Sequence, residues 1–130
     1  MPPLVYARKT TSAIPIVGCY SDIEALESDG LIVGTGWFEI KKVTGKYVAT
    51  FTELRDDGGE GYPEVKVKHL VVNKAKKVVV FDLALHLGGR KTVLKQVRGR
   101  ISRAGIKMNW RGHSTDYGQS DPFMKREKCG

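Results

Sequence analysis

The chain has 130 residues, of which 41% are hydrophobic and 28% are charged, as is typical of one globular domain that can bury a core without metal or disulfide help. Its net charge of +8 is unevenly distributed: residues 1–60 carry −3 (6 Lys and Arg against 9 Asp and Glu) and residues 61–130 carry +11 (16 against 5), so the second half can attract phosphate or acidic lipid. The chain has no run of about 18 apolar residues, which excludes a helical membrane span, and no visible signal peptide, so we expect a soluble protein, cytoplasmic rather than secreted.

One short helix is predicted near the start of the chain, and two cysteines lie near its ends. The segment from Ser21 to Ser28 predicts one short helix, because Ser21 can act as its N-cap and Glu24 stands at the capping-box offset. Cys19 and Cys129 lie near opposite ends of the chain and lack the spacing of a metal site, so we interpret them as two separate thiols. If they do pair, the bond would tie the two ends of the domain together and indicate a secreted protein.

Most of the chain from residue 31 to residue 126 alternates between apolar and polar residues with a period of two, which predicts antiparallel strands. The first hairpin turns at Thr44-Gly45. It predicts three cross-strand pairs, Phe38 with Phe51, Ile40 with Ala49, and Lys42 with Tyr47. The acidic segment 56–61 that follows lacks the ligand spacing of a calcium loop, and we interpret it as a solvated turn.

Three further hairpins follow. A four-residue turn connects predicted strands over residues 62–72 and 77–87. The turn at Gly88-Gly89 predicts the pairs Val80 with Val97, Asp82 with Lys95, and Ala84 with Val93. The turn at Arg103-Ala104 predicts the pairs Ile101 with Ile106, Gly99 with Met108, and Val97 with Trp110. These registers predict an all-β fold, an antiparallel meander that closes into a single barrel domain over residues 1–130, with its core in residues 31–126.

The predicted registers assign an inside and an outside to the barrel. The inner face consists of Phe38, Ile40, Tyr47, Ala49, Phe51, Val65, Val67, His69, Val71, Val78, Val80, Asp82, Ala84, Val93, Lys95, Val97, Ile101, Ile106, Met108 and Trp110. The outer face then carries Val79, Phe81, Leu83, Leu85, Leu87 and Leu94, which is too apolar for water. We expect segments before residue 30 or a second copy of the chain to cover it, and therefore favour a homodimer or higher oligomer.

Charged residues on the predicted inner face suggest a binding site. Asp82 and Lys95 are costly to bury, so they form either a partly wet ion pair at the barrel mouth or the polar anchors of a ligand, with His69 close by. The candidate ligand-binding residues are His69, Asp82, Lys95, Tyr47, Phe51, Met108 and Trp110. We expect a small, partly apolar ligand and neither a metal nor a cofactor. An enzyme that uses the same pocket is the alternative, with Asp82 or His69 moving the proton.

A basic cluster on the outer face supports a different class of function. The register brings Arg98, Arg100, Lys107 and Arg111 together, and these cations could bind nucleic acid or another polyanion. Proteins that bind nucleic acid on β-sheets add aromatic rings for base stacking, and here the nearby rings are predicted to point inward. The cluster therefore predicts weak binding that does not depend on sequence.

A meander of short strands around an apolar interior resembles the calycin group of barrels, which includes lipocalins and avidins. Lipocalins carry Gly-x-Trp on the first strand, a spacing that Gly34-Thr35-Gly36-Trp37 of this chain does not match, and a closing Arg with which Arg126 can be compared. The resemblance implies a barrel that holds a small apolar molecule. Some barrels of this kind act as cyclases or isomerases without a cofactor, so the resemblance does not decide between binder and enzyme.

Overall fold

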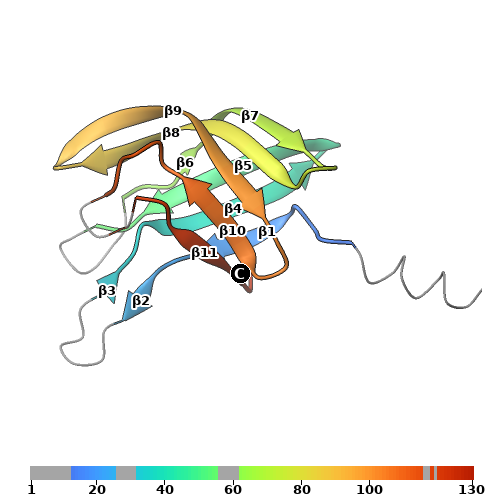
Figure 1. Cartoon of the computed structure of the whole chain (residues 1–130), viewed down its shortest axis with the longest axis horizontal. Coiled ribbons are helices and arrows are strands. Elements are labelled where there is room, and N and C mark those ends of the chain that lie inside the picture. The colour runs from blue at the N-terminus through green and yellow to red at the C-terminus, as the bar shows by residue number, and fades with distance from the viewer. Residues whose placement is uncertain (1–12, 26–31, 56–61, 116–117, 119) are drawn as a thin grey trace, which may run out of the picture.

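An antiparallel sheet of nine strands curls into a nearly closed barrel in a computed structural model, which describes residues 13–25, 32–55, 62–115, 118 and 120–130 (Figure 1). The barrel strands are β1 (Gly18–Ser21), β4 (Gly36–Val43), β5 (Lys46–Glu53), β6 (Val65–Lys66), β7 (Lys68–Asn73), β8 (Val78–Leu87), β9 (Arg90–Ile101), β10 (Gly105–Asn109) and β11 (Phe123–Glu127). A separate two-stranded ribbon consists of β2 (Glu24–Ala25) and β3 (Ile32–Val33). The predicted all-β, antiparallel barrel is confirmed.

The strand order explains how the barrel closes. The sheet runs β6-β5-β4-β1-β11-β10-β9-β8-β7, so the short β1 joins the first hairpin to the last strand. At the other junction β6 and β7 are separated by Val67 alone, and they behave as one bent strand. Its first part pairs with β5 and its second part pairs with β8. We call this junction between β5 and β8 the seam of the barrel.

Several predicted registers are confirmed. In the β4–β5 hairpin Phe38 pairs with Phe51 and Ile40 pairs with Ala49, and all four side chains are buried. The turn uses the left-handed conformation at Thr44 and at Gly45, as a two-residue hairpin turn requires. The β9–β10 hairpin pairs Ile101 with Ile106 and Gly99 with Met108, and the β8–β9 hairpin pairs Ala84 with Val93.

The predicted inside and outside of β8 are wrong, because β9 contains a bulge. Leu83 pairs with Leu94, whereas Phe81 pairs with Val97, so β9 has one extra residue between these pairs. Gln96 in the bulge has a positive φ of 53°. Because one inserted residue reverses the faces of a strand, the inward direction of Val97 does not extend back to Lys95 or Val93.

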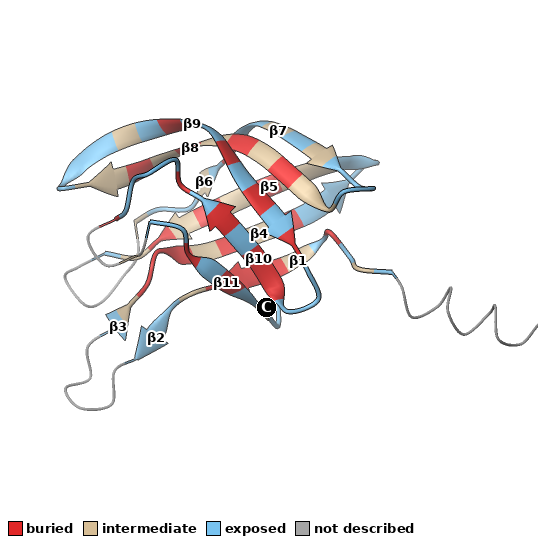
Figure 2. Cartoon of the chain, in the orientation of Figure 1, coloured by how far each residue is buried: buried red, intermediate tan, exposed pale blue. Residues whose placement is uncertain are grey.

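The face of β8 that was predicted to be apolar and exposed therefore points into the core. Val79, Phe81, Leu83, Leu85 and Leu94 are buried (Figure 2). Val78, Val80, Asp82, Ala84, Val93 and Lys95 alternate with these residues and point outward, and Val93 is 55% exposed. The exposed apolar face from which we expected a homodimer therefore does not exist on β8, and self-association stays a prediction without that support.

A second irregularity affects β7. Lys68 pairs with Asp82 and Val71 pairs with Val80, so the register shifts between these pairs, and His69 adopts a positive φ of 57°. Val67 before the shift is buried in the core, whereas Val71 after it is 63% exposed. The predicted inward positions of His69 and Val71 are therefore wrong, although Val71 and Val80 do share a face.

Aromatic side chains fill the interior of the barrel. The ring of Phe38 lies 5.2 Å from that of Phe81 and 6.2 Å from those of Tyr20 and Phe51, measured between centroids. Phe51 meets Trp110 edge-on at 6.1 Å. These large, fully buried rings occupy the space in which we expected a ligand, so a binding site has to be sought at the wall or the ends of the barrel.

The N-terminal predictions need two corrections. Ser21 ends β1, and its hydroxyl accepts a hydrogen bond from the Ile23 N–H (3.0 Å), so the predicted cap forms a turn rather than a helix. Glu24 and Ala25 form β2, and residues 26–28 of the predicted helix lie outside the described residues. The barrel also begins earlier than residue 31, because β1 is an interior strand of the sheet.

The two cysteines are joined, which contradicts their interpretation as separate thiols. Cys19 in β1 and Cys129, two residues after β11, form a disulfide with a Cα–Cα distance of 5.4 Å. The two cysteines are close because β1 pairs with β11, with Cys19 opposite Glu127. Distance along the chain concealed this proximity, since the barrel brings its first and last strands together. In the described part of the chain, no helix is long and apolar enough to cross a membrane.

Candidate functional site

The barrel wall is incomplete on one side of β8. The pairing of β7 with β8 ends at Lys68 and Asp82, so residues 83–87 of β8 pair with β9 on one side but with no strand on the other in the described chain. An open strand edge leaves backbone N–H and C=O groups that need partners. At this point side chains from other segments replace the missing strand.

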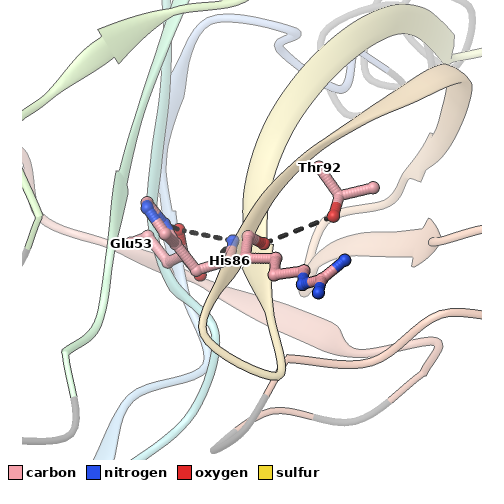
Figure 3. Close-up of polar contacts among 4 residues, drawn as sticks. Glu53, His86 and Thr92 are labelled. Atoms are coloured by element: carbon pink, nitrogen blue, oxygen red, sulfur yellow. Dashed lines mark hydrogen bonds and ion pairs between the residues drawn. The ribbon is translucent and has the colours of Figure 1, made fainter.

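Glu53, the last residue of β5, satisfies part of this edge. Its side chain is 6% exposed, and both carboxylate oxygens accept the backbone N–H of His86, at 3.1 and 2.9 Å. Glu53 Oε1 also lies 2.8 Å from His86 Nδ1 (Figure 3). Because an ionised carboxylate can only accept hydrogen bonds, His86 Nδ1 carries the proton, and in the neutral ring Nε2 is the hydrogen-bond acceptor.

Tyr62 covers the His86 ring. The two rings are stacked with centroids 3.7 Å apart and planes 5° from parallel. The Tyr62 backbone N–H donates to the carbonyl of Glu53 (2.8 Å), and Arg55 lies over the Tyr62 ring at 5.2 Å. The imidazole is therefore fixed by the carboxylate at its edge and by a phenol ring on its face.

A cavity of about 270 Å³ lies beside this pair, and we call it the seam pocket. Its lining residues are Phe51, Glu53, Tyr62, Pro63, Val65, Ala84, His86 and Lys91. The walls are mostly apolar, Glu53 contributes a buried carboxylate, His86 contributes a partly exposed imidazole, and Lys91 is an exposed cation. The hydroxyl of Thr92 donates to the Arg90 carbonyl (3.3 Å) within the same β8–β9 hairpin (Figure 3).

The predicted trio of His69, Asp82 and Lys95 does come together, but outside the barrel. His69 Nδ1 lies 2.7 Å and Lys95 Nζ 3.7 Å from Asp82 Oδ2. The side chains of His69 and Lys95 are 75% and 72% exposed, and that of Asp82 is 12% exposed. The trio is thus a surface cluster at the β9 bulge, and the predicted position inside a pocket is wrong.

The bulge also determines the electrostatics of Asp82. The Gln96 backbone N–H donates to Asp82 Oδ1 at 2.9 Å. This hydrogen bond is the main reason that the pKa of Asp82 is lowered, and the hydrogen bond from His69 and the charge of Lys95 act in the same direction. The carboxylate therefore stabilises the bulge by accepting the N–H group that the extra residue leaves without a ladder partner.

The other predicted ligand-binding residues are dispersed. Met108 and Trp110 are fully buried in the core, and Phe51 is buried but also lines the seam pocket. Tyr47 is half-buried near the β4–β5 turn, with the Lys42 ammonium 5.2 Å from its ring centroid. Of the predicted residues, only Phe51 lies at the seam pocket.

Glu53, Tyr62 and His86 were missed by sequence reasoning. A signal for Glu53 was available, because the inward positions Ala49 and Phe51 continue with a period of two to Glu53. A carboxylate at an inward position predicts a buried partner. That partner could not be identified, since the contact of β5 with β8 depends on where β7 leaves β8.

Three residues of the predicted basic cluster lie on β9 and β10, and the fourth, Arg111, follows β10. Arg98 pairs with Asn109 and Arg100 pairs with Lys107 on adjacent strands, and their side chains are exposed. Lys107 Nζ also donates to the carbonyl of Asp121 (2.5 Å). The prediction that nearby rings point inward is wrong for Phe123, which pairs with Lys107 and is 41% exposed.

A second cavity, of about 230 Å³, lies between the β2–β3 ribbon and β11. Its polar lining includes Asp22, Glu24, Lys125 and Glu127. The Asp22 carboxylate is already used, because it accepts the backbone N–H groups of Thr35 (2.8 Å) and Gly36 (3.0 Å) at the start of β4. Ile23, Val33 and Phe123 add apolar surface, but no imidazole of the described chain lines this cavity.

Comparisons of the chain with protein-family models, with curated proteins and with solved structures gave no match. A function therefore has to be inferred from the geometry of the chain itself.

Proposed function

We propose that this protein binds a small, partly apolar molecule in the seam pocket. The observation that carries the proposal is a cavity with mostly apolar walls that contains an imidazole held by a buried carboxylate. Binding sites for small molecules combine apolar walls with a few fixed polar groups in this way. The volume of about 270 Å³ suits a molecule of one or two rings rather than a long lipid.

The polar groups indicate the chemistry of the ligand. His86 Nε2 can accept a hydrogen bond from a hydroxyl or from a protonated acid, and the Lys91 ammonium can attract an anionic group. Phe51, Tyr62 and Val65 supply an apolar surface for the rest of the molecule. We therefore expect an aromatic or alicyclic body with one acidic or hydroxyl group.

A titration with 2-naphthol, whose hydroxyl can donate to His86 Nε2, followed by the backbone amide signals in NMR spectra, tests the proposal. We expect shifts at His86 and Ala84 that saturate, and at least tenfold weaker binding for Ala84→Phe, which fills the pocket from β8. Val80→Phe is the matched control, because Val80 is another half-buried, outward residue of β8 but does not line the pocket. Equal binding by both variants would contradict the proposed site.

Acid–base catalysis of the isomerase type is a second candidate. It is favoured by the Glu53–His86 pair, in which a carboxylate orients the imidazole through Nδ1 and leaves Nε2 as the nitrogen that can exchange a proton with a ligand. A test is deuterium exchange at the carbon next to the carbonyl in a panel of small ketones, followed by NMR. Exchange that His86→Gln abolishes and Ala84→Phe slows would support it, and exchange no faster than in buffer for the whole panel would refute it.

Polyanion binding by Arg98, Arg100, Lys107 and Arg111 stays a separate proposal. It gains some support from Phe123, an exposed ring beside Lys107 on which one base could stack. If these cations contact phosphates, the affinity for single-stranded RNA should fall with salt at a log–log slope of about −0.7 per contact. Arg98→Ala with Arg100→Ala should flatten that slope, and no retention of RNA on a filter at low salt would end the proposal.

Two finer points belong with the ligand proposal. We propose a calycin-like barrel, supported by the meander order and by β11 returning to pair with β1. Arg126, compared above with the closing Arg of lipocalins, lies 5.0 Å over the ring of Tyr20. We also infer an oxidising compartment, because the Cys19–Cys129 disulfide persists best there. Free-thiol quantification on freshly isolated protein tests the latter.

A further inference from the structure

One end of the barrel carries an excess of positive charge. In an antiparallel meander every second turn lies at the same end, so the turns β4–β5, β7–β8 and β9–β10 share an end (Figure 1). We call residues 42–46, 74–77 and 102–104 the basic end. These turns contain Lys42, Lys46, Lys74, Lys76, Lys77 and Arg103, and no Asp or Glu. The end of β11, which lies beside the β9–β10 turn, adds Arg126 and Lys128 and one carboxylate, Glu127.

The opposite end is different. Its described turns and strand ends contain Asp22, Glu24, Glu53, Glu64 and Asp121 beside Arg55, Arg90, Lys91 and Arg111. The charges of the described residues at that end are therefore almost balanced, so their positive excess lies at the basic end. A field that is polarised in this way orients the whole molecule towards an anionic partner.

The exposed residues of the basic end fit a membrane surface better than a nucleic acid. Five of its six cations are lysines, whose ammonium groups bind anions as point charges and not as the planar forks that read bases. Val43, at the tip of the first hairpin, is 48% exposed between Lys42 and the turn. The only ring close to these cations, Tyr47, is half-buried under Lys42 in the described chain.

We propose that the basic end docks this protein on membranes rich in anionic phospholipid. The lysines contact headgroups, and Val43 enters the interfacial layer while the barrel stays in water. Lysines near such a surface each strengthen binding by a factor of about five. The proposal is independent of the ligand in the seam pocket, which lies at the other end of β5 and β8.

Co-sedimentation of the full chain with vesicles tests the proposal. We expect binding to vesicles of 30% phosphatidylserine in phosphatidylcholine, no binding to pure phosphatidylcholine, and a steep loss between 50 and 300 mM salt, where screening lengths fall to several ångströms. The triple variant Lys46→Gln, Lys74→Gln, Lys76→Gln should bind about 100-fold more weakly, at about fivefold per lysine. These three side chains are exposed, so the fold should be retained.

The matched control is Arg90→Gln, Lys91→Gln, Arg111→Gln, which removes the same charge from the opposite end. The affinity of this control for acidic vesicles should fall by less than about threefold if the basic end is the contact surface. In Val43→Trp the new indole should shift its emission to the blue when acidic vesicles are added. Equal losses in the two triple variants, equal binding to neutral vesicles, or binding of poly(U) RNA without binding of acidic vesicles would each overturn the proposal.

Discussion

Replacing Glu53 is expected to destabilise the barrel at its seam. In Glu53→Ala the His86 backbone N–H loses its acceptor at an open strand edge, and the His86 ring loses the carboxylate that holds Nδ1. Hydrogen bonds to a charged group each contribute about 1.5–3 kcal/mol, and part of this is regained when water enters. We expect the free energy of unfolding to fall by about 2–4 kcal/mol, measured by urea denaturation at pH 7.

Glu53→Gln separates the two contacts. The amide oxygen can still accept the His86 backbone N–H, but the amide N–H₂ group would face Nδ1, so the ring has to move its proton to Nε2. We expect a loss of about 1–2 kcal/mol and a change of tautomer in the imidazole ¹⁵N shifts. Glu64→Gln, at an exposed position, is the control for lost charge. A loss below about 0.5 kcal/mol for Glu53→Ala, with the His86 signals unchanged, would refute the role given to this carboxylate.

Three further predictions follow from single contacts. Burial raises the pKa of Tyr20, so the folded state holds the phenol proton more tightly than the unfolded state does. The contribution of Tyr20 to the free energy of unfolding should be fully present below pH 10 and should be lost as the pH rises through the folded pKa. Urea midpoints of Tyr20→Phe should lack this pH dependence. The pKa of Asp82 is lowered in the folded state, so its carboxylate stabilises the fold at pH values above the ordinary pKa of 3.8. This stabilisation is lost as the pH falls through the folded pKa, and Asp82→Asn should therefore flatten the acid side of a plot of stability against pH. Reducing the Cys19–Cys129 bond, which spans 110 residues, should cost about 4–5 kcal/mol by loop entropy, and a thermal midpoint unchanged by reductant would contradict this.

The sequence determined the fold class because hairpin turns and alternation are local properties. The pairs Phe38 with Phe51 and Ile101 with Ile106 were predictable, since short turns fix the register on both sides. The error at β8 arose where one residue, Gln96, interrupts the alternation of β9. A bulge of this kind leaves no clear pattern in a single sequence, yet it reverses every inference that crosses it.

The site was harder to predict than the fold. His69, Asp82 and Lys95 do lie together, but the predicted pairs of Asp82 with Lys95 and of Val80 with Val97 are wrong, because Val80 pairs with Arg98. The face of the trio was assigned through the bulge and is therefore inverted. Glu53 and His86 are 33 residues apart and belong to strands that are not neighbours in the hairpin ladder. Their contact depends on where the bent β6–β7 strand changes partner, which is a property of the closed barrel and not of any local segment.

The Glu53 carboxylate at the seam can serve only to stabilise the fold, or it can also position His86 for a ligand. Two variants distinguish these roles. A buried carboxylate is costly unless N–H groups satisfy it, and the His86 contacts do so. Closing the edge does not, however, require an open cavity beside the stacked rings. Ala84→Phe fills the cavity without touching the pair, whereas Glu53→Gln changes the imidazole tautomer and leaves the walls in place. If 2-naphthol binding is lost in the first variant and retained in the second, the apolar walls select the ligand; if both lose it, His86 Nε2 is the acceptor that anchors the hydroxyl group.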